Sequence, residues 1–304
     1  DATKGWLPVS DDAVAFDHTA PPTQKGIFAY GTAAGFLSLS NLVTSSGVIG
    51  SDVTGVGTAR GNGVGAASYG GDKAIFGYGY DGSNYSMTNL VSNSGVIGSD
   101  VTGVGTARRE TTSTEYGIGL AIFAYGYTSG NVSMSNLVSN SGVVAADVSG
   151  VGTARYGLAS APYGTDKAIF GYGSGTTNIS NLISNVGVVG SDVSGVGTAR
   201  ARLSAAGYGG DKAIFAFGET TAISNLVSNT GVVAADTTGV GTARGLQGGA
   251  TEYGGDKAIF AYGENASHVS MSNLVSNSGV VATDTTGVGT ARNAGGAAGY
   301  SYSA

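Results

Sequence analysis

Short apolar runs separated by glycine-containing turns fill most of the chain, and residues 201–244 show the pattern clearly. The runs predict four successive strands, at 203–208, 212–217, 223–229 and from 232 onward. Gly209-Gly210-Asp211 predicts a tight turn between the first two, since glycine adopts positive φ at little steric cost. No stripe with the helical period of 3.6 residues extends across the unit, so the chain is predicted to be all-β.

This unit occurs six times. Each copy ends in Gly-Val-Gly-Thr-Ala-Arg, and the six terminal arginines are Arg60, Arg108, Arg155, Arg200, Arg244 and Arg292. Successive arginines are 48, 47, 45, 44 and 48 positions apart. Repeats of this length built from short strands are typical of propeller blades. One blade buries too little surface to be stable alone, so we expect a six-bladed β-propeller with four-stranded blades.

The two ends of the repeat region complement each other. The first repeat begins at Lys25 with its second strand, whereas Ala297-Ala298-Gly299-Tyr300 matches the first strand of the other repeats. Residues 293–302 are therefore predicted to supply the inner strand of the first blade, which would remove a free sheet edge. The predicted domains are an N-terminal arm, 1–24, and the propeller, 25–304.

The order of arginine, small residues, turn and Ile-aromatic-x-x-Gly resembles the kelch repeat, and residues 167–173 (Lys-Ala-Ile-Phe-Gly-Tyr-Gly) are similar to the second kelch strand. The resemblance covers about residues 25–304 and implies a propeller. Two departures make the chain a divergent kelch-like protein: Tyr172-Gly173 replaces the kelch double glycine, and the only tryptophan, Trp6, lies outside the repeats. The repeats are also similar to those of some phage-particle and microbial surface proteins.

Composition narrows the function classes. The net charge is −6, and the basic residues are spread among the repeats without forming a stripe, so no nucleic-acid partner is expected. No apolar run approaches 18 residues, so no membrane insertion is expected. The chain has no cysteine, which excludes disulfides and zinc–thiolate sites.

Recurrent charged residues are interpreted as structural. Six aspartates each precede a repeat-ending arginine by eight positions: Asp52, Asp100, Asp147, Asp192, Asp236 and Asp284. An Asp–Arg pair in every repeat predicts a hydrogen-bonded staple within or between blades. The alternative is a ring of ligand-binding groups, but a specific site rarely needs six identical copies.

Sequence variation among the repeats gathers in two segments, one after the arginine and one after the aromatic-Gly pair. In a four-stranded blade both segments emerge on the same face, and loops on a rigid scaffold commonly carry recognition. The predicted ligand-binding residues on this variable face are Tyr80, Asp81, Arg109, Glu110, Tyr127, Glu264 and His268. The alternative is neutral drift in surface loops between duplicated blades.

Signals for catalysis are weak. Only two histidines are present, His18 and His268, and the glycine-rich phrases do not follow a phosphate-loop pattern. The Ala/Gly-rich first strands also argue against a catalytic channel. No enzyme activity, metal or cofactor is therefore predicted.

The N-terminal arm contains an apolar segment that needs a partner surface. Trp6, Leu7 and Val9 are the predicted contact residues, either with the propeller or with another subunit of a particle or filament. We therefore expect a non-enzymatic extracellular or virion-surface protein whose variable face recognises a glycan or protein receptor. A purely structural subunit anchored by the arm and a secreted lectin are the alternatives.

Overall fold

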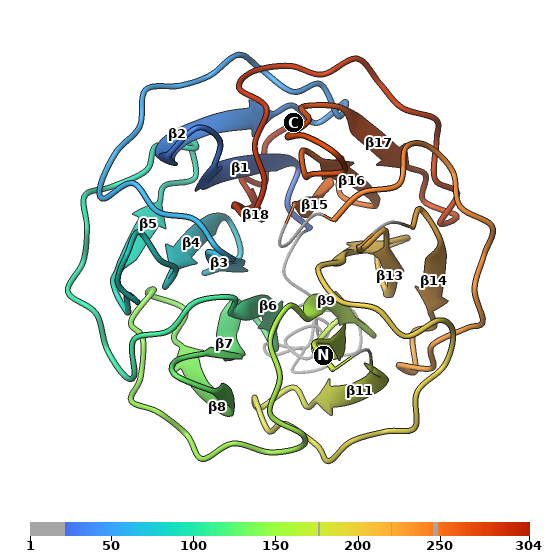
Figure 1. The fold of residues 1–304 in the computed structure, drawn as a ribbon, viewed down its shortest axis with the longest axis horizontal. Helices are drawn as coiled ribbons and strands as arrows, with labels where there is room; N and C mark the ends of the chain where they lie inside the picture. Colours follow the sequence, from blue (N-terminus) through green and yellow to red (C-terminus); the bar gives the residue numbers. More distant parts are fainter. Residues whose placement is uncertain (1–21, 176, 220, 246–248) are drawn as a thin grey trace, which may run out of the picture.

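The computed structural model describes residues 22–175, 177–219, 221–245 and 249–304. These residues form 18 strands in six three-stranded antiparallel sheets, which surround a common centre (Figure 1). No described residue is helical, and none belongs to a helix that could cross a membrane. The all-β prediction is confirmed, and the fold is propeller-like.

Each sheet has its inner strand nearest the centre, then a middle and an outer strand. In this order the sheets are β18-β1-β2 (Gly296–Tyr300, Lys25–Thr32, Phe36–Val43), β3-β4-β5 (Gly65–Tyr69, Lys73–Gly77, Thr88–Val91), β6-β7-β8 (Thr112–Tyr116, Leu120–Tyr127, Asn131–Val138), β9-β10-β11 (Ala159–Tyr163, Lys167–Gly173, Thr177–Ile183), β12-β13-β14 (Ser204–Tyr208, Lys212–Ala216, Ser224–Val227) and β15-β16-β17 (Ala250–Tyr253, Lys257–Ala261, Ser272–Val275).

The six inner strands contact one another in a closed ring and line a central channel. Their small side chains allow this convergence. A Cβ added to Gly65 would lie 2.9 Å from the Phe123 ring of the next sheet. Small residues therefore occur here because the sheets approach most closely near the axis.

The hydrophobic core lies between the sheets. Ile75 and Phe76 of the middle strand β4 are fully buried and point to opposite faces of their sheet. Phe76 packs edge-on against Tyr30 of the preceding sheet, with 5.4 Å between ring centroids. Equivalent clusters fill the other gaps between sheets. Burial of one such side chain is worth about 2 kcal/mol, and the repeat supplies this contribution six times.

The predicted fourth strand is present only as isolated bridges. After β14, Val227 bridges Val233 and Ser224 bridges Thr237, and every other sheet has the same two outer bridges. A continuous ladder does not form because part of this outer segment makes hydrogen bonds to the preceding repeat instead of to its own sheet. In the 201–244 repeat, the Asp236 carboxylate accepts hydrogen bonds from Thr198 of the preceding repeat.

The C-terminal strand closes the ring, as predicted. β18 pairs antiparallel with β1, with Lys25 opposite Tyr300 and Ala29 opposite Gly296. At the end of the predicted arm, the Gln24 N–H donates a 2.7 Å hydrogen bond to the Ser301 carbonyl. Trp6, Leu7, Val9 and His18 lie outside the described residues.

Candidate functional site

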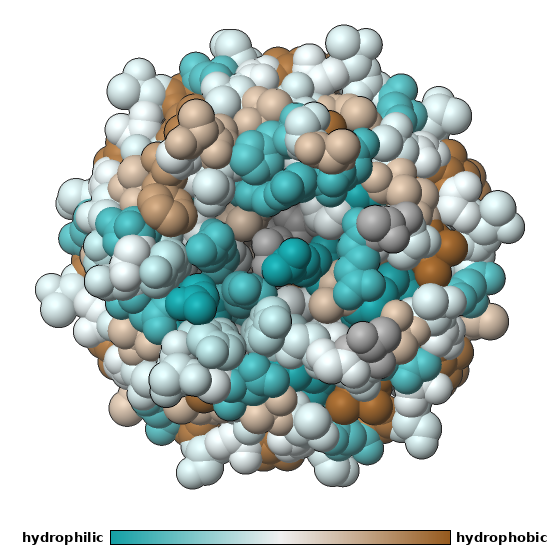
Figure 2. Space-filling model, viewed as in Figure 1, coloured by the Kyte–Doolittle hydropathy of each residue, from teal (hydrophilic) through white to brown (hydrophobic). Residues whose placement is uncertain are grey.

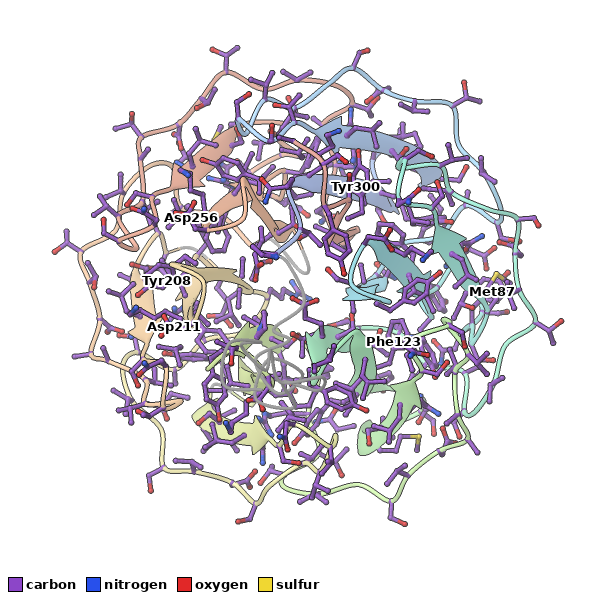
Figure 3. All side chains as sticks on the ribbon, turned by 180° about the vertical axis from the view of Figure 1, so that it is seen from behind. Met87, Phe123, Tyr208, Asp211, Asp256 and Tyr300 are labelled. Carbon is purple, nitrogen blue, oxygen red and sulfur yellow. The ribbon has the colours of Figure 1, made fainter. Side chains whose placement is uncertain are left out.

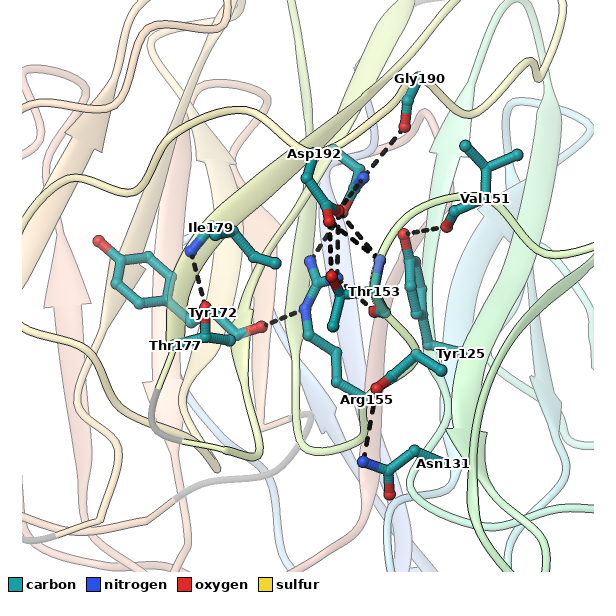
Figure 4. Close-up of polar contacts among 12 residues, drawn as sticks. Tyr125, Asn131, Val151, Thr153, Arg155, Tyr172, Thr177, Ile179, Gly190 and Asp192 are labelled. Atoms are coloured by element: carbon teal, nitrogen blue, oxygen red, sulfur yellow. Dashed lines mark hydrogen bonds and ion pairs between the residues drawn. The ribbon is translucent and has the colours of Figure 1, made fainter.

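The repeat-ending arginines join neighbouring sheets. Arg60 is fully buried, and its guanidinium lies 4.2 Å from the centroid of the Tyr30 ring. Its Nε donates a 2.8 Å hydrogen bond to the Tyr78 carbonyl, and its Nη2 donates a 2.7 Å hydrogen bond to Asn89. Figure 4 shows the same arrangement around Arg155, with Tyr125 on one side and the Tyr172 carbonyl on the other. A charge-assisted network thus links each sheet to the next.

The aromatic residue whose carbonyl receives the arginine has an unusual backbone conformation. Tyr78 has φ of 64°, in the left-handed region, and the five equivalent residues have φ of 57–64°. In β7 this residue forms a β-bulge, because the pairing of β7 with β8 shifts between Ala124 and Gly126. The bulge turns the carbonyl out of the ladder and towards the arginine.

The recurrent aspartates bind the preceding repeat. Asp100 accepts hydrogen bonds from the Thr58 N–H and hydroxyl, at 3.0 and 2.7 Å, and lies 4.0 Å from Arg60. Asn89 also donates to Asp100, at 2.8 Å. Partial burial alone would raise the pKa of Asp100, but these hydrogen bonds hold it below its usual value. The staple therefore runs between sheets.

Burial shifts the pKa of the other groups in this network. It raises the pKa of Tyr30 to about 12, against the opposing effect of the Arg60 charge. Burial also lowers the pKa of Arg60, which the Tyr30 and Asp100 charges partly offset. The raised pKa keeps the Tyr30 hydroxyl protonated at neutral pH.

The two variable segments lie side by side at one end of the sheets. Gly61 bridges Tyr80, Arg109 bridges Tyr127 and Gly245 bridges Glu264. In each pair the first residue follows a repeat-ending arginine and the second follows an aromatic-Gly pair. We call the surface formed by these segments the loop face.

An arginine between two aromatic rings is the main feature of the loop face. The Arg109 guanidinium lies 4.8 Å from the Tyr80 centroid and 4.7 Å from the Tyr127 centroid. Phe36 packs edge-on against Tyr80, and Tyr156 packs edge-on against Tyr127. All five side chains are partly exposed. They form a continuous aromatic–arginine ladder over four neighbouring sheets.

The remaining predicted residues lie in other places on the loop face. Asp81 accepts a 2.9 Å hydrogen bond from the Tyr85 hydroxyl. His268 lies 3.7 Å from the Glu264 carboxylate, which also accepts a hydrogen bond from Asn293. Glu110 lines the central channel. The structure thus brings Tyr80, Arg109 and Tyr127 together, and Glu264 and His268 together, as two groups.

A hollow of about 490 Å³ on the loop face has Glu264 in its wall, but not Tyr80, Arg109, Tyr127 or His268. It is lined by Tyr156 at the end of the ladder and by Arg202, Glu219, Glu264 and Asn293 from the following repeats. The face in Figure 2 is hollowed at its centre, and hydrophilic residues surround the hollow. Tyr156, Arg202, Glu219 and Asn293 were not among the predicted site residues, although all four occupy variable segments.

Sequence reasoning also missed two acids inside the channel, Glu115 and Glu252. Each directly precedes the tyrosine that ends an inner strand, at a position occupied by small or apolar residues in the other repeats. That contrast was the available signal. Among the described residues, no group of three or more His, Asp or Glu side chains could hold a metal ion.

Comparison with known proteins supports the fold alone. No protein-family model matches the chain, and no curated protein matches it. A protein of unknown function from Bacteroides caccae is similar in structure, with a TM-score of 0.50 and 11% identity over 88% of this chain and 94% of that one. A fungal alcohol oxidase of the AA5 family, solved with copper, has a TM-score of 0.50 and 12% identity over 82% of this chain and 69% of that one.

Proposed function

We propose that the chain is a divergent kelch-like, six-bladed β-propeller that binds a glycan through its loop face. Each sheet together with its outer bridged segment is one blade, and this segment acts as a short fourth strand. The paired outer bridges, such as Ser40 with Val53 and Val43 with Ile49, support this assignment.

The observation that carries the proposal is the position of Arg109 between Tyr80 and Tyr127, in a ladder whose last ring, Tyr156, lines a polar hollow. Aromatic rings provide apolar faces on which sugar rings stack, and a rigid scaffold presents them at little entropic cost. Arg202, Glu264 and Asn293 supply donors and acceptors for hydroxyl groups in the same hollow. This combination fits a carbohydrate better than a strongly apolar ligand.

A binding role agrees better than a catalytic role with the contacts of these side chains. Arg109 stacks on two rings, Asp81 accepts from Tyr85 and Glu264 accepts from Asn293. Such mutual contacts fix the shape of a recognition surface. We accordingly propose a non-enzymatic protein of the cell exterior or of a virion surface, used for attachment.

A glycan array with the whole chain tests this proposal. We expect selective binding that Arg109→Ala and Tyr127→Ala reduce at least about tenfold, as for anchor residues worth more than 1 kcal/mol. Lys212→Ala is the matched control: Lys212 lies at the turn between β12 and β13, at the end of the sheet opposite the loop face, and its substitution should leave binding unchanged. Binding that persists in both loop-face variants would overturn the proposed site.

An array without any hit would overturn the glycan assignment. A protein receptor and a structural subunit anchored by residues 1–24 would then remain. Pull-down with the wild-type loop face and with the two variants separates these alternatives, because only receptor binding depends on Arg109 and Tyr127.

A further inference from the structure

The central channel contains two carboxylates at one repeat position. The residue before the last tyrosine of each inner strand lines the channel, and in chain order these residues are Ser68, Glu115, Pro162, Gly207, Glu252 and Gly299. Glu115 lies on β6 and Glu252 on β15. The inner strands follow the order β18, β3, β6, β9, β12, β15 around the ring, so β6 and β15 are three sheets apart and opposite (Figure 1).

The two acids line the same cavities of the channel. A cavity of about 80 Å³ and a second of about 230 Å³ both include Glu115 and Glu252 in their walls. The smaller cavity exceeds the roughly 10–15 Å³ that one water requires. The Glu115 and Glu252 side chains are each partly buried, and both line the two cavities.

No positive charge of the described chain neutralises this pair. Lys, Arg and His are absent from the described residues that line the smaller cavity. Two lysines line the larger cavity, but Lys167 lies 3.0 Å from Asp166 and Lys212 lies 2.8 Å from Asp211. Figure 3 shows Asp211 and Asp256 at equivalent turns of neighbouring sheets. Each of these two lysines therefore already forms an ion pair with an aspartate of its own turn, and not with Glu115 or Glu252.

Hydrogen bonds compensate the two carboxylates unequally. The Glu252 carboxylate accepts a hydrogen bond from the Gly207 N–H. A Cβ on Gly207 would contact this carboxylate, which would have to move aside. No described residue donates a hydrogen bond to the carboxylate of Glu115, a partly buried residue that lines the channel. A carboxylate in this setting either holds its proton or gains a cation.

Electrostatics reinforces this conclusion. Burial raises the pKa of Glu115 to about 7. Burial and then the Glu115 charge raise the pKa of Glu252 to about 8. Both groups therefore release their protons near neutral pH, and a bound cation would displace the protons that remain.

We propose that a divalent cation of the Ca²⁺ class binds in the central channel between Glu115 and Glu252. Two carboxylates match its charge of +2. The other polar side chains at the smaller cavity, including those of Glu110, Ser68 and Ser113, also carry oxygen atoms, and hard cations prefer oxygen ligands. Waters in the cavity complete the coordination shell. This site is separate from the loop face and does not depend on the proposed glycan binding.

Calorimetric titration of the whole chain with CaCl2 at pH 8.5 tests the site. We expect one saturable event per chain, and weakening by at least about tenfold in Glu115→Gln and in Glu252→Gln, since affinity follows the number of charged ligands. Glu219→Gln removes the same charge on the loop face and should bind like the wild type. Affinity should fall when the pH is lowered to 6.

Thermal unfolding provides the second readout. Ca²⁺ should raise the unfolding temperature of the wild type and of Glu219→Gln, but not that of either channel variant. The glutamine variants keep the side-chain shape, and circular dichroism checks their fold. No saturable heat in the wild type, or equal heat in Glu252→Gln, would overturn the proposal.

Discussion

Arg60 Nη2 donates a 2.7 Å hydrogen bond to Oδ1 of Asn89, which lies 29 positions later on the next sheet. The same bond recurs between Arg108 and Asn136, Arg155 and Asn181, Arg200 and Asn225, and Arg244 and Asn273. We call each of these contacts between neighbouring sheets a joint. At the sixth joint, between the last sheet and the first, Arg292 Nη2 and Asn41 Oδ1 are both buried without a hydrogen-bond partner. The closing joint is therefore the least satisfied of the six, since unmade buried hydrogen bonds are costly.

This difference predicts unequal effects of one substitution at two joints. Arg108→Lys removes the Nε and Nη2 bonds and leaves buried acceptors unpaired, which should reduce the unfolding free energy by about 3 kcal/mol. Arg292→Lys should cost clearly less, because Arg292 Nη2 has no bond to lose. Urea unfolding of the two variants, which have identical chemistry, provides the measurement. Equal losses would contradict the weak-joint interpretation.

A single hydroxyl distinguishes the repeats at the aromatic position. Tyr125 donates a 3.1 Å hydrogen bond to the Val151 carbonyl, and Tyr172 does the same to Val196. The equivalent residue Phe217 has no hydroxyl. We expect Phe217→Tyr to add the bond to Val240 and stabilise the fold by about 0.5–1 kcal/mol, and Tyr125→Phe to cost a similar amount. The unfolding temperatures of the two variants test this, because one should rise and the other should fall relative to the wild type. A loss of stability in both variants would contradict it.

The channel acids predict how stability depends on pH. Their pKa values in the folded chain, about 7 and about 8, lie above the ordinary glutamate value, so the unfolded chain ionises first. The unfolding free energy should therefore fall as pH rises from about 4.5 to about 8, with a chelator present. The Glu115→Gln/Glu252→Gln double variant should flatten this part of the profile. Glu219→Gln, at an exposed position, should retain the slope.

The opposite dependence should appear at low pH. Hydrogen bonds hold the pKa of Asp52, Asp100 and Asp147 below the usual aspartate value. Their contribution is complete above that value and is lost as pH falls through their folded pKa. Acid unfolding should thus persist in the double channel variant, which separates the two groups of carboxylates.

The sequence was sufficient to predict the order and closure of the sheets, but it did not show which side chains would come together at the candidate sites. The repeat predicted the strand order, and the match between Ala297–Tyr300 and Ala205–Tyr208 predicted the closing pair. The opposition of Glu115 and Glu252 could not be recognised within one repeat, because it arises only when the third and sixth sheets are placed in a ring. The Arg109 stack likewise needs Tyr80 from one sheet and Tyr127 from the next.

The outer segment shows a different limit. Val232 to Ala234 follow a strand-like apolar pattern, yet only isolated bridges form there. The Asp236 side chain bonds to the preceding repeat, a contact that strand propensity does not include. Pairing between repeats thus overrides the local pattern.

Two tyrosines on one strand separate the structural from the functional surface. Tyr125 on β7 is fully buried, has φ of 57° and presents its carbonyl to Arg108. Tyr127, two positions later, is partly exposed and stacks on Arg109. Tyr125→Ala should reduce the unfolding free energy by about 3–5 kcal/mol, whereas Tyr127→Ala should change it by less than about 1 kcal/mol.

Unfolding and glycan-binding measurements on the same two variants complete this prediction. Tyr127→Ala should lose binding with an almost unchanged unfolding temperature, because its ring contributes to the ladder but not to the core. A large loss of stability in Tyr127→Ala would instead show that the ladder holds the loops in place. The variable residues on this strand would then serve the fold, and Arg109 would be a staple of the loop face.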